Sequence, residues 1–226
     1  MVITGASGGL GSYLVQQFAN ECQIIGTFNT RQPEIGRANV SYYQVDVSNA
    51  ESVERFVRSL NSELKQIVLV NLAGISIDGM AHKMPEDVWD RVVDTNLKGT
   101  FLMCRALLPI MRDQGWGRII NISSIVAQKG VMGTVAYSAS KGGIFSLTRT
   151  LAVENAIKGI TVNALALGYF EVGMINVLKP EMKELVLSTI PMRKFGHPRN
   201  IELAIRFLIE ADYVTGAVIN INGGLL

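Results

Sequence analysis

The sequence is poor in the residues that build disulfide scaffolds and metal sites. Two of its 226 residues are cysteines, Cys22 and Cys104, and no C-x-x-C spacing occurs. Two distant thiols in a chain of this length are typical of unpaired cysteines in a reducing compartment, so we expect a cytoplasmic protein. The two histidines, His82 and His197, fall in irregular segments without the spacing of zinc ligands, and we predict no metal site.

Long apolar runs and a marked excess of one charge are also missing. No apolar run reaches the roughly 18 residues that a membrane-spanning helix needs, and the opening MVIT carries no cationic leader, so we expect no membrane association. Lysine and arginine total 21 against 19 acidic residues, and the basic residues are scattered. This net charge of +2 offers no continuous track for a phosphate backbone, and we expect no nucleic-acid partner.

What the sequence does have is a regular alternation of short β-branched runs and longer helical patterns. Several short runs, such as QIVLVN and ITVNALA, are apolar throughout, as strands buried on both faces must be. The alternation predicts a parallel sheet with helices on both faces, and right-handed crossovers make a doubly wound α/β fold the main candidate. With no internal repeat and no linker, residues 1–226 are expected to form one domain.

The least regular region runs from residue 168 to residue 198. It holds three of the six prolines and no clear strand pattern. An irregular segment of this length inside a compact domain often covers a binding site. We therefore expect residues 168–198 to form a mobile lid.

A glycine-rich turn separates the first expected strand from the first expected helix. It reads TGASGGLG over residues 4–11, and Gly5, Gly9 and Gly11 permit a tight turn close to a bound pyrophosphate. The following helix presents free N–H groups and the positive end of its dipole to an anion. The spacing differs from the general G-x-G-x-x-G fingerprint, and glycines alone also fit a turn without a ligand. The strand before and the helix after favour a dinucleotide site.

The end of the second expected strand bears on the choice of cofactor. NAD-selective sites place a carboxylate here to accept from the ribose hydroxyls, but residues 26–31 read GTFNTR. Asn29 and Thr30 can bond a 2′-phosphate and Arg31 can pair with it, so we favour NADP(H) over NAD(H). Arg31 in a solvated loop is the plainer alternative. Asp46, after the third strand, either accepts from an adenine amino group or caps the next helix.

Four polar residues have the chemistry of a proton-transfer site. Tyr137 and Lys141 are expected one helical turn apart, where the ammonium would lower the pKa of the phenol toward neutral pH. Ser124 ends a strand and would face the crevice at the carboxyl edge of the sheet. Asn96 lies in an otherwise apolar helix, where it competes with the backbone for hydrogen bonds. Each of these residues alone is more often structural than catalytic.

Together these motifs resemble the classical branch of the short-chain dehydrogenase/reductase family. The resemblance extends to the closing NGG at residues 222–224 and so covers nearly the whole chain. It implies a single Rossmann-type domain with about seven parallel strands in the order 3-2-1-4-5-6-7. The motifs that carry it, in the family's order and spacing, are the glycine turn, Asn71-x-Ala73-Gly74, Asn96, Ser124 and Tyr137-x-x-x-Lys141.

The resemblance also implies a mechanism and a set of cofactor contacts. A nicotinamide delivers hydride to a carbonyl carbon while Tyr137 protonates the carbonyl oxygen and Ser124 stabilises its charge. Lys141 binds the nicotinamide ribose and keeps the tyrosine acidic, and Asn96 holds a water that relays protons. The residues implied to contact the cofactor are Gly5, Ser7, Gly9, Leu10, Gly11, Asn29, Thr30, Arg31, Asp46, Val47, Asn71, Ala73, Gly74, Tyr137, Lys141, Gly168 and Phe170.

Residues 73–101 and 190–224 look like those of 3-oxoacyl-acyl-carrier-protein reductases. Such enzymes reduce a 3-oxoacyl thioester with NADPH in fatty-acid synthesis and form tetramers through two long helices and the last strand. The resemblance implies that a carrier protein docks through basic residues near the mouth of the site, where Lys158 occupies one position and Arg112 substitutes for a second. The plainer role of Lys158 is to interact with its helix C-terminus.

Three departures from the family pattern leave alternatives open. Leu72 replaces an asparagine, Leu167 a proline, and Val172 a threonine that touches the nicotinamide carboxamide. A related reductase of another small ketone, sugar or polyol is one alternative. A dinucleotide-binding or assembly subunit without turnover is another, although all four proton-transfer residues are present.

Overall fold

The computed structural model describes residues 1–33, 36–60, 64–173, 175 and 179–226. Its centre is one seven-stranded sheet in the order β3-β2-β1-β4-β5-β6-β7, and every pair of neighbouring strands is parallel. This is the fold and strand order that the sequence predicted. The strands are β1 (Val2–Ile3), β2 (Ile24–Phe28), β3 (Val40–Gln44), β4 (Val68–Asn71), β5 (Gly117–Ser124), β6 (Ile160–Leu167) and β7 (Val218–Ile221).

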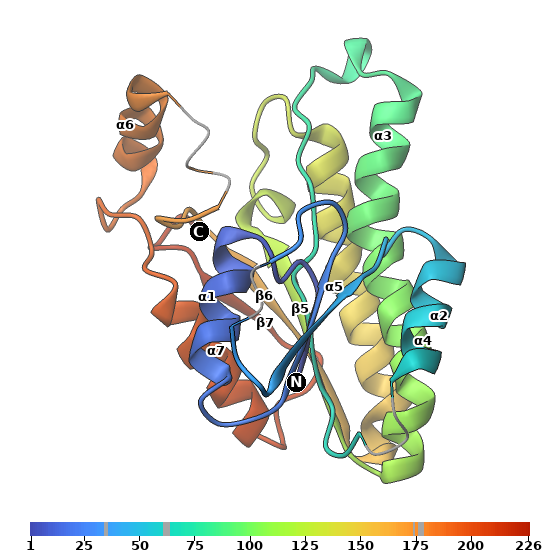
Figure 1. Cartoon of the computed structure of the whole chain (residues 1–226). Helices are drawn as coiled ribbons and strands as arrows, with labels where there is room; N and C mark the ends of the chain where they lie inside the picture. The colour runs from blue at the N-terminus through green and yellow to red at the C-terminus, as the bar shows by residue number, and fades with distance from the viewer. Residues whose placement is uncertain (34–35, 61–63, 174, 176–178) are drawn as a thin grey trace.

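Helices cover both faces of the sheet, with α1 and α7 on one side and α2, α4 and α5 on the other (Figure 1). Short 3-10 turns are η1 (Ala81–Lys83), η3 (Ile125–Ala127) and η4 (Ala156–Lys158), and η2 (Asp94–Lys98) is a π-helical turn. The α-helices are α1 (Gly9–Phe18), α2 (Ala50–Ser59), α3 (Glu86–Val93), α4 (Gly99–Gln114), α5 (Val135–Asn155), α6 (Pro180–Thr189) and α7 (Arg199–Glu210).

The apolar pattern of the sequence explains this layering. On α1, Leu14, Val15 and Phe18 recur at helical spacing and are all buried against the sheet. Strands β5 and β6 are buried along their whole length, as central strands between two helical layers must be. No described helix is both long and apolar enough to cross a membrane.

The strand order reverses between β1 and β4, and this reversal positions the site. Chain connections leave β1 and β4 toward opposite faces of the sheet, so a crevice opens at their carboxyl ends. There the Thr4 hydroxyl accepts hydrogen bonds from the backbone N–H groups of Leu72 and Ala73, each at 3.0 Å. The glycine turn after β1 is thereby fixed against the segment after β4.

The segment predicted to be a lid contains a helix that the sequence did not reveal. Helix α6 begins at Pro180, which suits a first helical position, and it stands apart from the layers of the fold in Figure 1. An isolated bridge between Phe170 and Gly196 joins the two ends of the segment. Residues 174 and 176–178 of the predicted lid lie outside the described residues.

Candidate active site

The glycine turn is shaped to hold an anion against the backbone. Gly5 has φ +68°, and a Cβ there would lie 2.9 Å from the Cα of Ala73. A Cβ at Gly11 would overlap the Gly5 carbonyl, so a side chain fits at neither position. Helix α1 follows with Gly8 at its N-cap and no side-chain cap. Its first N–H groups therefore remain available to a pyrophosphate, and the cradle fits a dinucleotide.

The residues predicted to choose the cofactor lie beside this turn. The N–H of Ala6 donates to the carbonyl oxygen of Thr27 at 2.8 Å, which joins the turn to the end of β2. The next residues, Asn29, Thr30 and Arg31, are all exposed. Their side chains are thus presented to solvent next to the cradle, where a ribose phosphate would lie. Ser7 and Leu10, also predicted contacts, are half-buried in the turn itself.

Asp46 does not cap helix α2, so that alternative is wrong. Its Oδ1 accepts from the N–H of Ser48 at 3.0 Å and from the Ser48 hydroxyl at 2.7 Å. The cap of α2 is Asn49, whose side chain accepts from the N–H of Ser52. Val47, the neighbour of Asp46, is buried against Gly99 at the start of α4.

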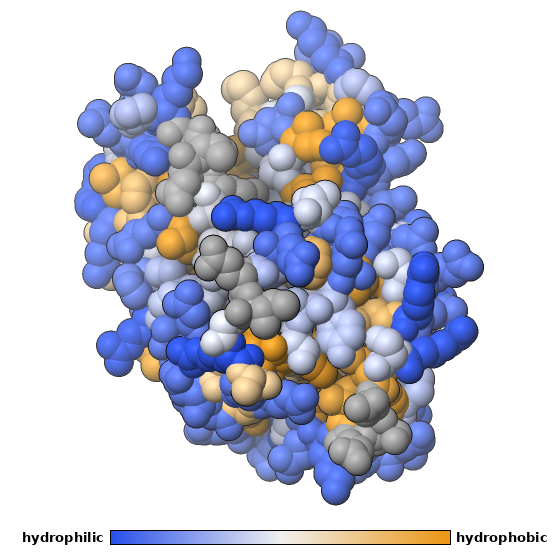
Figure 2. Space-filling view, in the orientation of Figure 1, coloured by the Kyte–Doolittle hydropathy of each residue, from blue (hydrophilic) through white to orange (hydrophobic). Residues whose placement is uncertain are grey.

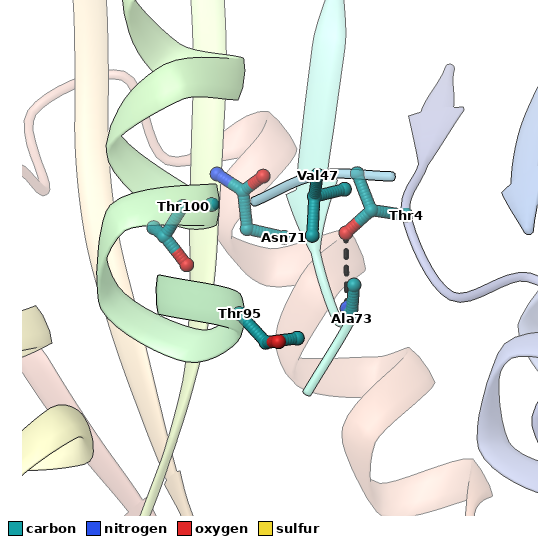
Figure 3. Close-up of a pocket in the computed structure, with 7 residues that line it drawn as sticks. Thr4, Val47, Asn71, Ala73, Thr95 and Thr100 are labelled. Carbon is teal, nitrogen blue, oxygen red and sulfur yellow. Dashed lines mark hydrogen bonds between the residues drawn. The ribbon is translucent and has the colours of Figure 1, made fainter. Parts of the chain in front are cut away.

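A narrow pocket lies beneath the cradle, and it is too tight to hold a water molecule (Figure 3). The Asn71 amide nitrogen donates to Asn121 Oδ1 at 2.9 Å and to Cys104 Sγ at 3.3 Å. Its amide nitrogen therefore joins β4 to β5 and α4, its Oδ1 has no hydrogen-bond partner among the described residues, and a cofactor contact at Asn71 stays a prediction. The residues that line the pocket are Thr4, Val47, Asn71, Ala73, Thr95, Gly99 and Thr100.

Asn96 is the buried centre of the π turn between α3 and α4. Its Oδ1 accepts from the N–H of Ile75 at 2.8 Å, and its Nδ2 donates to the carbonyl of Ile75 at 2.9 Å and to Ser140 Oγ at 3.0 Å. The carbonyl of Asn96 accepts from the Thr100 hydroxyl at 2.7 Å. This polar residue interrupts the regular helix, as the sequence indicated, and the π turn marks the interruption.

Ser124, Tyr137 and Lys141 meet where β5 ends and α5 begins. Ser124 is the last residue of β5, and Tyr137 lies in the first turn of α5 with an exposed fraction of 8%. Lys141 is 3% exposed, and its Nζ donates to the carbonyl of Ile122 at 2.8 Å. A Cβ on Gly74 would lie 3.0 Å from Asn96 Oδ1 and 3.4 Å from Lys141 Nζ. The structure thus brings all four predicted proton-transfer residues to one place.

The environment of Tyr137 overturns one electrostatic expectation. Burial raises its pKa to about 12; the Ser124 hydroxyl partly opposes this, and Asp78 and Tyr169 add to it. Burial also lowers the pKa of Lys141 to about 8. The prediction that Lys141 brings the pKa of Tyr137 down toward neutral pH is wrong in this structure, because burial of the phenol in an apolar cluster has the largest effect.

Apolar side chains surround Tyr137 on the side facing the predicted lid. One cluster contains Ile125, Val126 and Tyr137 itself, with Tyr169 and Leu187 from the lid packed against it. Two residues that were predicted to contact the cofactor lie outside this cluster, and Phe170 packs in the cluster around α1. Gly168 donates from its N–H to the Ile221 carbonyl at 2.9 Å, and Phe170 is 7% exposed.

Lys158 and Arg112 are far from the mouth of the site in the same chain, contrary to expectation. Lys158 follows the end of α5, whereas Tyr137 is in its first turn, roughly 30 Å away along the helix axis. Arg112, near the end of α4, donates to Asn155 Oδ1 at 2.7 Å. Both residues lie at the amino edge of the sheet because their helices run antiparallel to the strands they cross.

The family model for short chain dehydrogenases matches residues 1–183. The chain belongs to the short chain dehydrogenase family. It is 37% identical to nodulation protein G of Azospirillum brasilense and 38% identical to acetoacetyl-CoA reductase of Shinella zoogloeoides, covering 99% of this chain and 96% of each relative. It is 35% identical to 3-oxoacyl-[acyl-carrier-protein] reductase FabG of Rickettsia felis, covering 100% of this chain and 95% of that protein. The chain is therefore an oxidoreductase of a family that binds an NAD(P) dinucleotide.

The short chain dehydrogenase fold gives a structural account of two departures. Leu72 packs its side chain against the cluster around α1, while its backbone N–H bonds Thr4, so the strand keeps its support without an asparagine. Val172 and Gly173 lie beside Gly9, where an added Cβ would be 3.1 Å from the Gly173 nitrogen and 3.6 Å from the Val172 Cβ, so this part of the lid packs closely against the glycine turn. Leu167 ends β6 and is buried.

Sequence reasoning missed Ser140, Asn121 and Thr4. Each is a buried polar side chain that fixes a predicted site residue or its strand. A polar residue within an apolar strand was the available signal for Asn121 in GRIINIS. Ser140 was visible only as a small neighbour of Tyr137, because its partner Asn96 is 44 residues away.

Proposed function

We propose that the protein is an NADPH-dependent reductase of 3-oxoacyl thioesters on acyl carrier protein, forming the 3-hydroxyacyl product in cytoplasmic fatty-acid synthesis. The observation that carries the proposal is the meeting of Ser124, Tyr137 and Lys141 beside an uncapped glycine turn. Two of the relatives above are named for reductions of this class, acetoacetyl-CoA and 3-oxoacyl-[acyl-carrier-protein].

The chemical step assigns one role to each polar side chain. The glycine turn and Lys141 would hold a reduced nicotinamide cofactor, which would supply the hydride that converts the carbonyl carbon into a carbinol carbon. Tyr137 donates its phenolic proton to the carbonyl oxygen, and the Ser124 hydroxyl donates a hydrogen bond to the same oxygen as negative charge develops. A pKa near 12 keeps the phenol protonated at neutral pH, so it starts in the form that donates.

Lys141 and Asn96 are assigned supporting roles in the proton transfer from Tyr137. The Lys141 ammonium is positioned to bind the nicotinamide ribose and to stabilise the phenolate left by proton transfer. Its pKa near 8 leaves it mostly charged at neutral pH. Asn96 holds the π turn beside Lys141, where its backbone carbonyl would bind a water that returns a proton to the phenol.

The cofactor preference rests on the exposed residues after β2. Arg31 would pair with a 2′-phosphate, and Asn29 and Thr30 would hydrogen-bond it. No carboxylate occupies residues 26–33, where an acid would accept from the ribose hydroxyls of NAD. These features support NADPH over NADH.

The substrate assignment rests on the apolar cluster beside Tyr137, which suits an acyl chain. A coenzyme A thioester is the second candidate, because 38% identity to an acetoacetyl-CoA reductase favours it as much as the carrier-bound form. We also propose a homotetramer. The exposed apolar side chains of Phe101, Val153 and Ile157 support pairing between copies. Lys158 and Arg112 are far from the site of their own chain, so they would serve carrier docking at the site of a neighbouring copy.

The test measures NADPH oxidation by absorbance at 340 nm with acetoacetyl-carrier protein, acetoacetyl-coenzyme A, and a panel of small ketones and sugars. Turnover of the thioesters by the wild type, absent in Tyr137→Phe, supports the proposal. Turnover of the small carbonyls alone would replace the substrate class. Tight NADPH binding with no turnover on any carbonyl would favour a binding subunit instead.

A further inference from the structure

Ser140 stands out among the residues between the two reactive side chains of α5. Of Ser138, Ala139 and Ser140, only Ser140 is buried, with an exposed fraction of 0%. Its hydroxyl donates to the Tyr137 carbonyl at 2.8 Å and accepts from Asn96 Nδ2 at 3.0 Å. One side chain thus joins the first turn of α5 to the π turn.

The bond from Asn96 to Ser140 completes the hydrogen bonding of a buried carboxamide. Ile75 supplies partners for the Oδ1 atom and for one N–H of Asn96, and Ser140 Oγ accepts from the Nδ2 group as well. A carboxamide has two N–H groups, so loss of the Ser140 hydroxyl would leave one of them buried without a partner. The two bonds to Ile75 would remain, but the carboxamide would lose the bond that ties it to α5.

We propose that Ser140 is a positioning residue that fixes the Asn96 carboxamide and, through it, the π turn beside Lys141. Asn96 Oδ1 and Lys141 Nζ both lie against Gly74, where no Cβ fits without displacing the carboxamide. A shift of Asn96 would therefore change the packing around Gly74, which the Lys141 ammonium shares. The kinetic part of this inference rests on the proposed function, whereas the structural part does not.

The structural part is tested by hydrogen exchange of the Asn96 carboxamide protons, followed by NMR in the protein without ligands. The signals are assigned by their loss in Asn96→Asp. We expect exchange to be about tenfold faster or more in Ser140→Ala, because a buried hydrogen bond is lost. Ser138→Ala is the matched control. It removes a hydroxyl bonded at 2.8 Å to Oγ1 of Thr134, the N-cap of α5, and should leave the Asn96 exchange unchanged.

The kinetic part uses a double-mutant cycle with Asn96→Ala and an acetoacetyl thioester. Ser140→Ala is expected to lower kcat about tenfold and to shift the pH profile of kcat, with little change in the KM for NADPH. In the Asn96→Ala background the same change has almost no further effect, because the residue it positions is gone. Ser140→Thr, which keeps the hydroxyl, restores the wild-type pH profile.

Three results would overturn the inference. They are unchanged Asn96 exchange in Ser140→Ala, additive losses in the cycle, and a lower melting temperature with an unshifted pH profile. If Ser140→Ala does not fold, Ser140→Cys gives the same comparison, since a thiol keeps the size but bonds weakly. A wild type that reduces no thioester would refute the proposed function and leave the exchange result standing.

Discussion

The two ends of the predicted dinucleotide site differ in how the chain holds them. At the catalytic end, Asn96, Ser140 and Lys141 are at most 3% exposed, and each makes hydrogen bonds at 2.8 to 3.0 Å. At the phosphate end, Asn29, Thr30 and Arg31 are exposed at the end of β2. Figure 2 shows that hydrophilic side chains cover most of the face in view, with several hydrophobic patches between them.

Because of this difference, we expect substitutions at the two ends to change different measured quantities. A change at the buried end disturbs groups that the fold holds in fixed positions, so it alters the rate of the chemical step and the free energy of unfolding. A change at the exposed end removes a contact made only when cofactor is bound. It should alter cofactor affinity and leave the free energy of unfolding nearly unchanged.

The largest expected effect is at the reacting carbonyl. Ser124→Ala should lower kcat by about 10²- to 10³-fold, because the hydroxyl stabilises charge that develops only in the transition state. NADPH binding, measured by cofactor fluorescence, should stay within about threefold of the wild type. Equal losses in kcat and cofactor affinity would show that Ser124 supports the site as a whole rather than the carbonyl oxygen.

A second prediction concerns the buried charge of Lys141. Its folded pKa of about 8 lies below its usual value of 10.5, so above pH 8 the unfolded chain binds a proton that the folded chain has lost. The free energy of unfolding should therefore rise with pH between about 8 and 10, by on the order of 3 kcal/mol. Lys141→Met should lack this rise.

Denaturant titrations of both proteins at several pH values between 7 and 10 measure this effect. Burial raises the pKa of the Cys104 thiol to about 12, which opposes the rise above pH 9. The difference between wild type and Lys141→Met cancels that opposing contribution, because both proteins contain Cys104. Parallel curves for the two proteins would show that the ammonium carries no burial cost.

The third prediction is at the exposed end. Arg31→Glu should reduce the preference for NADPH over NADH about 10- to 100-fold, since a carboxylate repels the 2′-phosphate and accepts from ribose hydroxyls. The melting temperature should stay within about 1 °C of the wild type. Arg37→Glu, another exposed arginine, is the matched control and should leave the preference unchanged. A preference unaffected by Arg31→Glu would place cofactor selection elsewhere.

The smallest expected effect is at the rim of the catalytic end. The Asp78 carboxylate contributes to the raised pKa of Tyr137, although burial contributes more. Asp78→Asn should therefore lower the pKa of Tyr137 only slightly, because Asp78 is exposed and solvent screens it. Ultraviolet titration of Asp78→Asn, with Tyr137→Phe to identify the signal, measures the shift. A rise in the pKa would contradict the sign of this interaction.

The sequence by itself determined the fold, because its signals are local. Apolar runs such as QIVLVN mark strands buried on both faces, and the helical spacing of Leu14, Val15 and Phe18 marks the buried side of α1. A glycine turn between a strand and a helix can be recognised without knowing what lies nearby. The same holds for Tyr137 and Lys141, whose spacing places them on one helical face.

Only the tertiary structure decided the electrostatics and the supporting contacts. The pKa of Tyr137 depends on how deeply the lid and η3 bury the phenol. These segments are far apart in the sequence, so the sequence pattern could not show that they pack against Tyr137. The sequence pattern could not show that α5 carries Lys158 away from the site, because that depends on which way the helix runs across the sheet. Asn96 and Ser140 are partners only because the fold packs η2 against α5. Local spacing sets an element's type and face, but burial and long-range hydrogen bonds arise only after the elements pack.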